Sequence, residues 1–167
     1  LMITKTVDNT TGIPAFAFLQ AIKYCVDNGA DILNLSSVGY YPSYQLAEDV
    51  ILYAYKKNVL LVTAVGNKDT SSIAFPALNQ YTLAVGATEP DDTRARNFLN
   101  EGDKSSCGAG IDIVAPGKHI VVLSIDDDNN YSSLTGGTSY STAYATGVAS
   151  LLLSLNPELT PDQLKTV

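Results

Sequence analysis

Two short stretches of the chain combine residue types that could carry out chemistry together. Near the C-terminal end, GGTS (residues 136–139) ends in Ser139 and leads into small and apolar residues that continue almost to Pro157. Nearer the middle, Asn67 follows an apolar run and Gly66. A serine hydroxyl is a nucleophile when a base takes its proton, and an asparagine amide is a neutral donor that can stabilise an oxyanion.

Each of these residues also has an ordinary structural role, so neither alone indicates catalysis. Serine or threonine before a helix commonly caps the helix N-terminus. Gly-Asn pairs are common in turns. If a helix begins near Ser139, however, its unpaired amides and its dipole favour negative charge at that point, which suits an alkoxide or a tetrahedral oxyanion.

The composition argues against several classes of protein. The 167 residues carry a net charge of -7 without a cluster of Lys and Arg, which argues against a nucleic-acid partner. No uncharged apolar run reaches the roughly 18–20 residues of a membrane span. Nucleotide motifs such as G-x-G-x-x-G are absent, and one histidine without a Cys-x-x-Cys pair gives no metal-binding pattern. Cys25 and Cys107 leave a disulfide open, but free thiols are the simpler expectation.

Hydrophobic periodicity predicts helices that alternate with buried strands. Helices are predicted at residues 14–29, 44–58 and 137–155, the last of them fully buried, and a final short helix opens at Pro161. Strands are predicted at residues 31–38, 59–67, 81–88, 110–117 and 119–125. The apolar faces of the first two helices are predicted to consist of Phe18, Ala21, Ile22, Cys25 and Val26, and of Leu46, Val50, Tyr53 and Ala54.

This alternation predicts an α/β architecture with a mostly parallel sheet and helices on both faces. Ligands of such sheets bind at the carboxyl ends of the strands. The loops that follow the strands, including those that hold Asn67 and Ser139, are therefore the expected functional region.

Sequence motifs occur in a fixed order along nearly the whole chain: ILNLSSVG (32–39), VLLVTAVGN (59–67), FPALNQYTLAVGAT (75–88), IDIVAPG (111–117) and GGTSYSTAYATGVASLLLSLNPELTPDQL (136–164). In this order and spacing they resemble the subtilisin-like serine proteases, the subtilases. The combination is specific, although no single piece is. The resemblance implies a subtilisin-like fold whose N-terminal part is missing, with residues 1–167 as the C-terminal part of one partial peptidase domain.

The resemblance also implies a role for each candidate residue. Ser139 matches the nucleophile, Asn67 matches the oxyanion-hole residue, and Thr138 supports the same hole. Ser36 and Gly39 match the strand that pairs with the extended substrate backbone. The other wall of the pocket for the side chain before the scissile bond is assigned to Ala64, Val65 and Gly66.

Several features depart from the family pattern. The catalytic aspartate and histidine of the family precede the region matched here, and the single histidine, His119, is expected at the surface near the start of a strand. Ala143 and Tyr144 replace the Pro-His that usually follows the nucleophile. SSVG (36–39) carries one extra residue, which leaves the register of the substrate strand open, and EGDKSS (101–106) resembles an insertion.

The resemblance suggests one cation site. The family often binds Ca²⁺, and the backbone oxygens of Ala77, Asn79 and Thr82, with the carboxylate of Asp112, resemble one of its weaker sites. The chemistry at Ser139 itself requires no cofactor.

Three functions are compatible with these residues. The first is a serine endopeptidase that forms an acyl-enzyme on Ser139, with Asp and His supplied by an upstream segment of the same domain, so that this chain alone is expected to be inactive. The second is a catalytically dead subtilase-like binding or regulatory protein, and the third is a small-molecule-binding α/β domain. The first explains the ordered motifs best; its partner is a peptide or protein substrate, and the family-level expectation is a secreted or cell-surface protein.

Overall fold

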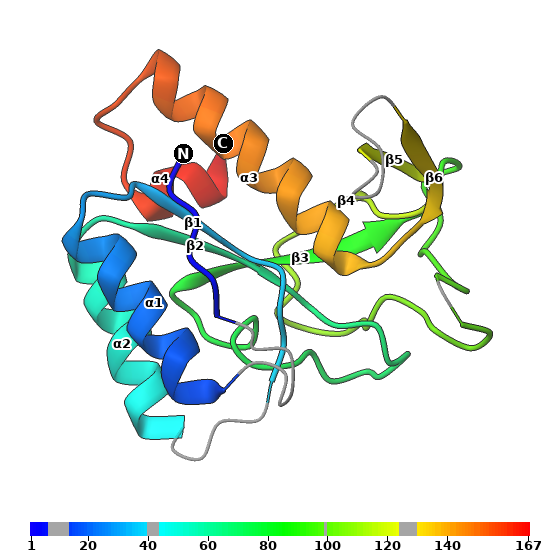
Figure 1. The fold of residues 1–167 in the computed structure, drawn as a ribbon, viewed down its shortest axis with the longest axis horizontal. Coiled ribbons are helices and arrows are strands. Elements are labelled where there is room, and N and C mark those ends of the chain that lie inside the picture. The colour runs from blue at the N-terminus through cyan, green and yellow to red at the C-terminus, as the bar shows by residue number, and fades with distance from the viewer. Residues whose placement is uncertain (7–13, 40–43, 99, 124–129) are drawn as a thin grey trace.

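A four-stranded parallel sheet forms the centre of the fold (Figure 1). The computed structural model describes residues 1–6, 14–39, 44–98, 100–123 and 130–167, and of residues 132–135 it describes the backbone alone. The strands lie in the order β1 (Ile32–Leu35), β2 (Leu60–Ala64), β3 (Thr82–Thr88) and β4 (Ile113–Pro116), and each neighbouring pair is parallel. Each of these four strands falls within a range predicted from the sequence.

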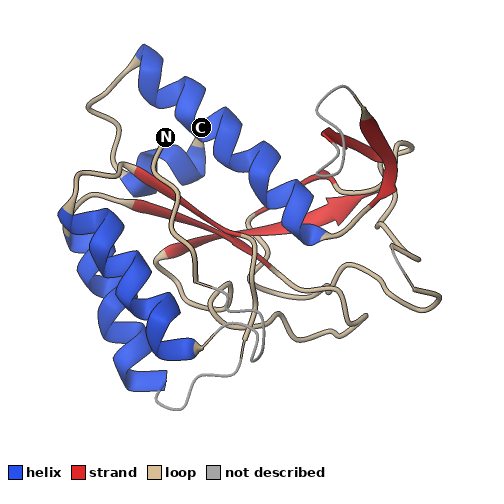
Figure 2. Cartoon of the chain, in the orientation of Figure 1, coloured by secondary structure: helices blue, strands red, loops and turns tan. Residues whose placement is uncertain are grey.

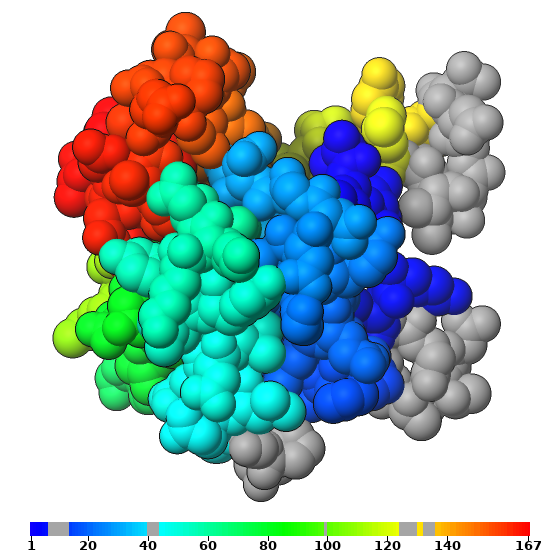
Figure 3. All heavy atoms as spheres, turned by 90° about the vertical axis from the view of Figure 1, so that its left-hand side faces the viewer, coloured from blue at the N-terminus to red at the C-terminus, as the bar shows by residue number. Residues whose placement is uncertain are grey.

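Helices cover both faces of this sheet (Figure 2). On one face lie α1 (Ala15–Asp27) and α2 (Tyr44–Lys56), which Figure 3 shows packed side by side. On the other face lie α3 (Thr138–Leu155) and α4 (Pro161–Thr166). The predicted α/β fold, with a mostly parallel sheet between helices, is confirmed.

Alternating side chains of the strands build a core on each face. In β2, Leu61 packs with residues of α1 and α2, whereas Leu60 and Val62 pack with residues of α3 and α4. Every residue of β2 and of β3 is buried. Burial on both faces explains why these strands are continuous apolar runs in the sequence.

The chain leaves the parallel sheet after β4. There β5 (Ile120–Leu123) pairs antiparallel with β6 (Tyr131–Thr135) in a separate two-stranded sheet. The sequence predicted the first of these strands but not the second. The segment YSSLT has little apolar character, so it carries no clear strand signal.

The buried face of α2 is shifted by about one position from the predicted one, and of the four predicted residues only Ala54 is buried. The buried residues are Ala47, Ile51 and Ala54, whereas Leu46 is 43% exposed. In α1 the predicted stripe is buried except for Ala21, which is half-buried, and Leu19 joins it. Both cysteines are free thiols, Cys25 buried in α1 and Cys107 partly exposed.

The prediction that α3 is fully buried is wrong. Its sheet side is buried, but its other side carries exposed apolar residues at spacings of four, three and four: Tyr144, Val148, Leu151 and Leu155. A helix that is apolar all round is expected to be covered all round, and within the described residues only the sheet side is covered. None of the described helices is both long and apolar enough to cross a membrane.

The position of the α2 stripe can be tested by two substitutions on that helix. Ile51→Ala should lower the free energy of unfolding by about 2–5 kcal/mol, because it leaves a cavity at a side chain that is 1% exposed. Leu46→Ala should cost clearly less, since that residue is already partly in solvent. Urea denaturation measures both, and a larger loss for Leu46→Ala would favour the stripe predicted from the sequence.

Candidate active site

The candidate residues meet at the carboxyl ends of β1 and β2, beside the start of α3. Ser36 directly follows β1, Asn67 lies three residues after β2, and Ser139 is the second residue of α3. Hydrogen bonds join Ser139 to Ser36 and Thr138 to Asn67. The fold therefore brings together residues that lie far apart in the sequence.

Ser139 and Ser36 exchange a reciprocal pair of hydrogen bonds. The Ser139 Oγ donates to the carbonyl oxygen of Ser36 at 2.9 Å, and the Ser36 Oγ donates to the carbonyl oxygen of Ser139 at 2.9 Å. Ser36, and not Ser37, is thus the residue that contacts Ser139. The Ser139 side chain does not cap the helix, because Gly137 is the N-cap residue and α3 has no side-chain cap hydrogen bond.

Asn67 faces the first residue of α3. Its Oδ1 accepts from the Thr138 N–H at 3.0 Å and from the Thr138 Oγ1 at 2.9 Å. Because a backbone N–H can only donate, the atom that faces it is the amide oxygen. Within the described residues Nδ2 has no acceptor, so it can donate to a ligand. Gly137, with φ of 143°, allows the close approach, since a Cβ there would lie 3.1 Å from Nδ2.

The start of α3 supplies a second donor beside the Asn67 amide. The first N–H groups of a helix have no carbonyl one turn earlier to bind, and the helix dipole places partial positive charge at this end. The N–H of Ser139 is one of these groups. Together with Asn67 Nδ2, it can hold negative charge on an oxygen next to the Ser139 hydroxyl.

A turn after β4 fixes the start of α3, a contact that the sequence alone did not predict. The Gly117 carbonyl accepts the Gly137 N–H at 2.7 Å, and the Ser141 Oγ donates to the Pro116 carbonyl at 3.2 Å. A Cβ on Gly117 would lie 2.4 Å from both the Ala87 Cβ and the Ser141 Oγ. Only glycine lets the two turns come this close.

Asn34 links the end of β1 to α3, and it too was missed. Its Nδ2 donates to the Ser36 Oγ at 2.8 Å, and its Oδ1 accepts from the Thr146 Oγ1 at 3.0 Å. The hydroxyl that binds Ser139 is therefore itself oriented. Nothing in its sequence position marks Asn34, because it lies inside a predicted strand.

The segment that resembled an insertion holds the loop of Asn67 in place. The Lys104 N–H donates to the Asn67 carbonyl at 3.3 Å. Asp69 forms ion pairs with Lys104 at 2.7 Å and with Arg94 at 2.6 Å. The hydrogen bond from Lys104, followed by the charges of Lys104 and Arg94, holds the pKa of Asp69 below its usual value.

The remaining candidates lie near this edge of the sheet. Ala64, Val65 and Gly66 are buried, and the peptide groups of Val65 already bond to Val85 and Ala74. The Gly39 N–H donates to the Phe75 carbonyl at 3.4 Å, and residues 40–43 lie outside the described part.

No histidine or carboxylate among the described residues bonds to Ser139. His119 is exposed directly before β5, with φ of 56°, as expected for a residue near the start of a strand. The described residues therefore offer no base within hydrogen-bond reach of the Ser139 hydroxyl.

Comparison with known proteins supports the family resemblance. All of residues 1–167 match the model of the subtilase family. The chain belongs to the subtilase family. Subtilisin BL of Lederbergia lenta is 38% identical over 146 residues, and the cell wall-associated protease of Bacillus subtilis (strain 168) is 40% identical over 155 residues. These matches confirm the assignment to the C-terminal portion of a subtilase.

The matched relatives are longer than this subtilase chain. The alignment covers 87% of the chain but 50% of subtilisin BL, and 93% of the chain but 16% of the cell wall-associated protease. A solved structure of the prenylagaramide maturation protease PagA matches with a TM-score of 0.79 and 30% identity, covering 95% of this chain and 58% of that one.

The ion pairs of Asp69 with Lys104 and Arg94, which hold the Asn67 loop, predict that the folded protein loses stability at low pH. The pKa of Asp69 is lower in the folded than in the unfolded chain, so its contribution is complete above the ordinary carboxyl pKa of 3.8 and is lost as the pH falls through the folded value. Asp69→Asn should therefore lower the melting temperature at pH 7, and this deficit should shrink as the pH falls below about 4.

Two features allow the effect of Asp69→Asn to be assigned to the lost charge. Asp69 has φ of 51°, a conformation that asparagine also tolerates, so the substitution removes charge without backbone strain. Glu101→Gln on the neighbouring segment is the control, because Glu101 has no ion pair within the described residues. A deficit of equal size at every pH from 7 to 3 would contradict the assignment.

Proposed function

We propose that this chain is the nucleophile-bearing part of a serine endopeptidase, with residues 1–167 as the C-terminal part of one peptidase domain. The observation that carries the proposal is the meeting of Ser139, at a helix N-terminus, with the Asn67 amide, whose oxygen is held by Thr138. Membership of the subtilase family and the named proteases among the relatives support it.

The geometry suggests how a peptide bond would be cleaved. The Ser139 Oγ attacks the carbonyl carbon while a histidine takes its proton, and the oxyanion is held by Asn67 Nδ2 and the Ser139 N–H. Collapse then breaks the C–N bond, the histidine gives the proton to the leaving amine, and water hydrolyses the acyl-enzyme. In the structure the Ser139 hydroxyl donates to the Ser36 carbonyl. This hydrogen bond would have to break so that the hydroxyl can donate to the histidine instead.

We assign the histidine and the aspartate to an upstream segment of the same domain. Among the described strands β1 is an edge strand, so one side of its backbone is open to pairing. A groove of about 1140 Å³ runs beside it, lined by residues 1–6 in part, by α1 and by α3. The relatives' greater length supports such a segment, and the chain without it is proposed to be inactive.

The same resemblance supports the substrate-binding assignment. Ser36 and Gly39 would face the extended substrate, with Ala64, Val65 and Gly66 as the opposite wall of the pocket. Because the Val65 peptide groups bond internally, this wall would act by shape. Pairing with the substrate would fall to the strand of Ser36 and Gly39, where the Gly39 N–H would exchange its 3.4 Å bond to the Phe75 carbonyl for one to the substrate. The substrate is a peptide or protein, and no cofactor is required for the chemistry.

A location outside the cell or at its surface is part of the proposal. One relative bears the name cell wall-associated protease, which supports that location.

A catalytically dead, subtilase-like binding protein is the second candidate. The observations that favour it are Ala143 and Tyr144 in place of Pro-His and the satisfied hydrogen bond between the Ser139 hydroxyl and the Ser36 carbonyl. The family match gives no support to a small-molecule-binding α/β domain.

Labelling with a fluorophosphonate, which reacts with activated serines, tests the nucleophile. In the full-length protein the label should map to the peptide that contains Ser139, and Ser139→Ala should abolish turnover while substrate binding survives. Ser150→Ala, another serine of α3, is the matched control and should behave like the unaltered protein. Absence of labelling in protein whose upstream segment is present and folded would favour the dead homologue.

Removal of the Asn67 amide tests the oxyanion hole. Asn67→Ala should lower kcat by about 10²–10³-fold with a small effect on KM, because the amide acts on charge that develops in the transition state. Steady-state kinetics measure both constants, and a melting curve shows whether loss of the bonds to Thr138 also unfolds the site. Unchanged kcat in a folded variant would remove Asn67 from the mechanism.

A further inference from the structure

The oxygen donors that the sequence suggested for Ca²⁺ lie around the first residue of β3, at the opposite end of the strand from Ser139. Of the four predicted ligands, the oxygens of Asn79, Thr82 and Asp112 already accept hydrogen bonds within the protein. The Asn79 carbonyl accepts both the N–H and the Oγ1 of Thr82, at 3.1 and 2.9 Å. The Asp112 Oδ2 accepts the Ala84 N–H at 2.8 Å.

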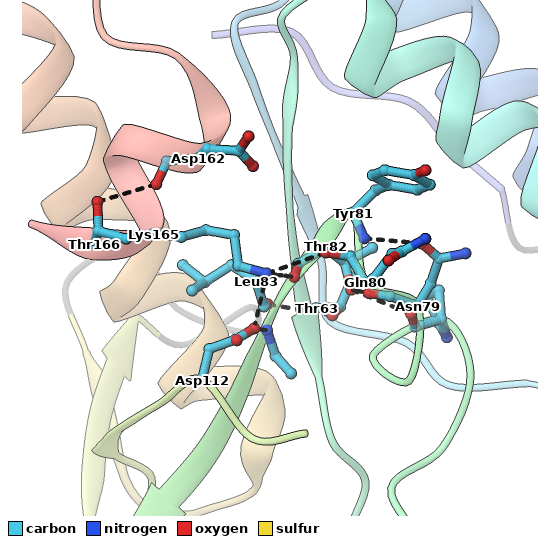
Figure 4. A network of polar contacts seen from close by, with 12 residues as sticks. Thr63, Asn79, Gln80, Tyr81, Thr82, Leu83, Asp112, Asp162, Lys165 and Thr166 are labelled. Carbon is cyan, nitrogen blue, oxygen red and sulfur yellow. Dashed lines mark hydrogen bonds and ion pairs between the residues drawn. The ribbon is translucent and has the colours of Figure 1, made fainter. Parts of the chain in front are cut away.

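The Lys165 ammonium of α4 lies among these donors (Figure 4). Its Nζ donates to the Thr82 carbonyl at 2.7 Å and to the Gln80 carbonyl at 3.3 Å, and it lies 3.4 Å from the Asp112 Oδ2. The side chain of Lys165 is only 18% exposed. An ammonium has three N–H donors, so these three oxygens match its full capacity.

These contacts do not fit the predicted Ca²⁺ site. Calcium takes six to eight oxygens at about 2.3–2.6 Å, whereas here three oxygens surround a nitrogen at hydrogen-bond distances. A divalent cation at this position would meet the positive charge and the atoms of Lys165. The donor set of Ala77, Asn79, Thr82 and Asp112 is therefore not available as a unit.

Helix α4 is well fixed for delivering this ammonium. Thr160 and Gln163 form a capping box at its start, and Leu164, 7% exposed, packs in the core under α3. The Tyr55 hydroxyl donates to Asp162 at 2.7 Å and so ties α4 to α2. With the helix held on several sides, little additional ordering is needed to place the Lys165 side chain.

We propose that the Lys165 ammonium takes the place of a structural cation in this chain. It joins three parts of the fold with one positive charge: the turn that leads into β3, the carboxylate just before β4, and helix α4. Stability of this region is then independent of Ca²⁺. Loss of the lysine side chain frees three oxygens, with room for a cation and its water ligands.

The test uses the full-length protein and two substitutions of Lys165. Lys165→Met keeps the length of the side chain and removes the charge, and it should lower the melting temperature by roughly 5–10 °C, because hydrogen bonds to a charged group are lost. The matched control is Lys23→Met, which removes an exposed lysine paired with Asp27 and should change the melting temperature by less than about 2 °C. Equal melting temperatures for the two variants would overturn the proposal.

Cation binding is read directly with Tb³⁺, whose luminescence is excited through a nearby tyrosine such as Tyr81. Lys165→Ala should gain a Tb³⁺ signal that millimolar Ca²⁺ displaces and that Lys165→Ala with Asp112→Asn lacks. The unaltered protein and its Asp112→Asn variant should give equal signals. An Asp112-dependent, Ca²⁺-displaceable signal in the unaltered protein, or its absence in Lys165→Ala, would overturn the proposal, and neither result depends on proteolytic activity.

Discussion

The place of Ser139 depends on how closely the backbone of neighbouring turns approaches the first residue of α3. Gly117 and Gly137 come within hydrogen-bond distance of each other, and a side chain on Gly117 would collide with Ala87 and Ser141. Asn67 completes the contact by accepting two hydrogen bonds from Thr138. Because these approaches fix the helix start, the hydroxyl, the free amide and the helix N–H groups keep one mutual arrangement, as preorganised electrostatic stabilisation requires.

The core on both faces of the sheet fixes the positions of these turns. Strands β2 and β3 are buried along their whole length between two layers of helices, so their carboxyl ends cannot shift without opening the core on both sides. The loops that leave these ends are then held by polar contacts, of which the pairing of Asp69 with Lys104 and Arg94 is the clearest. Rigid strands set the positions, and the loop contacts set the orientation of the side chains.

The sequence allowed the central sheet and α1 to be predicted, because hydrophobic runs and helical periodicity are local signals. The pairing of Ser139 with Asn67 was predicted from the order of motifs along the whole chain. The face of α2 was misplaced because Leu46 and Ala47 are adjacent apolar choices, and packing against the sheet decides between them. The partners of Asn34 and Lys165 could not be found in this way, since Thr146 and Thr82 lie 112 and 83 residues away. Such contacts follow from how whole elements dock.

The edge of β1, which is unpaired within the described part of the chain, and the exposed apolar stripe of α3 have a consequence for the chain on its own. An unpaired strand edge is a template for pairing with another chain, and a continuous apolar helix face favours association. If no other segment covers these surfaces, two copies of the chain can associate through hydrogen bonds along β1 and through apolar contacts along α3. The net charge of -7 opposes this self-association through mutual repulsion, and added salt would weaken that protection.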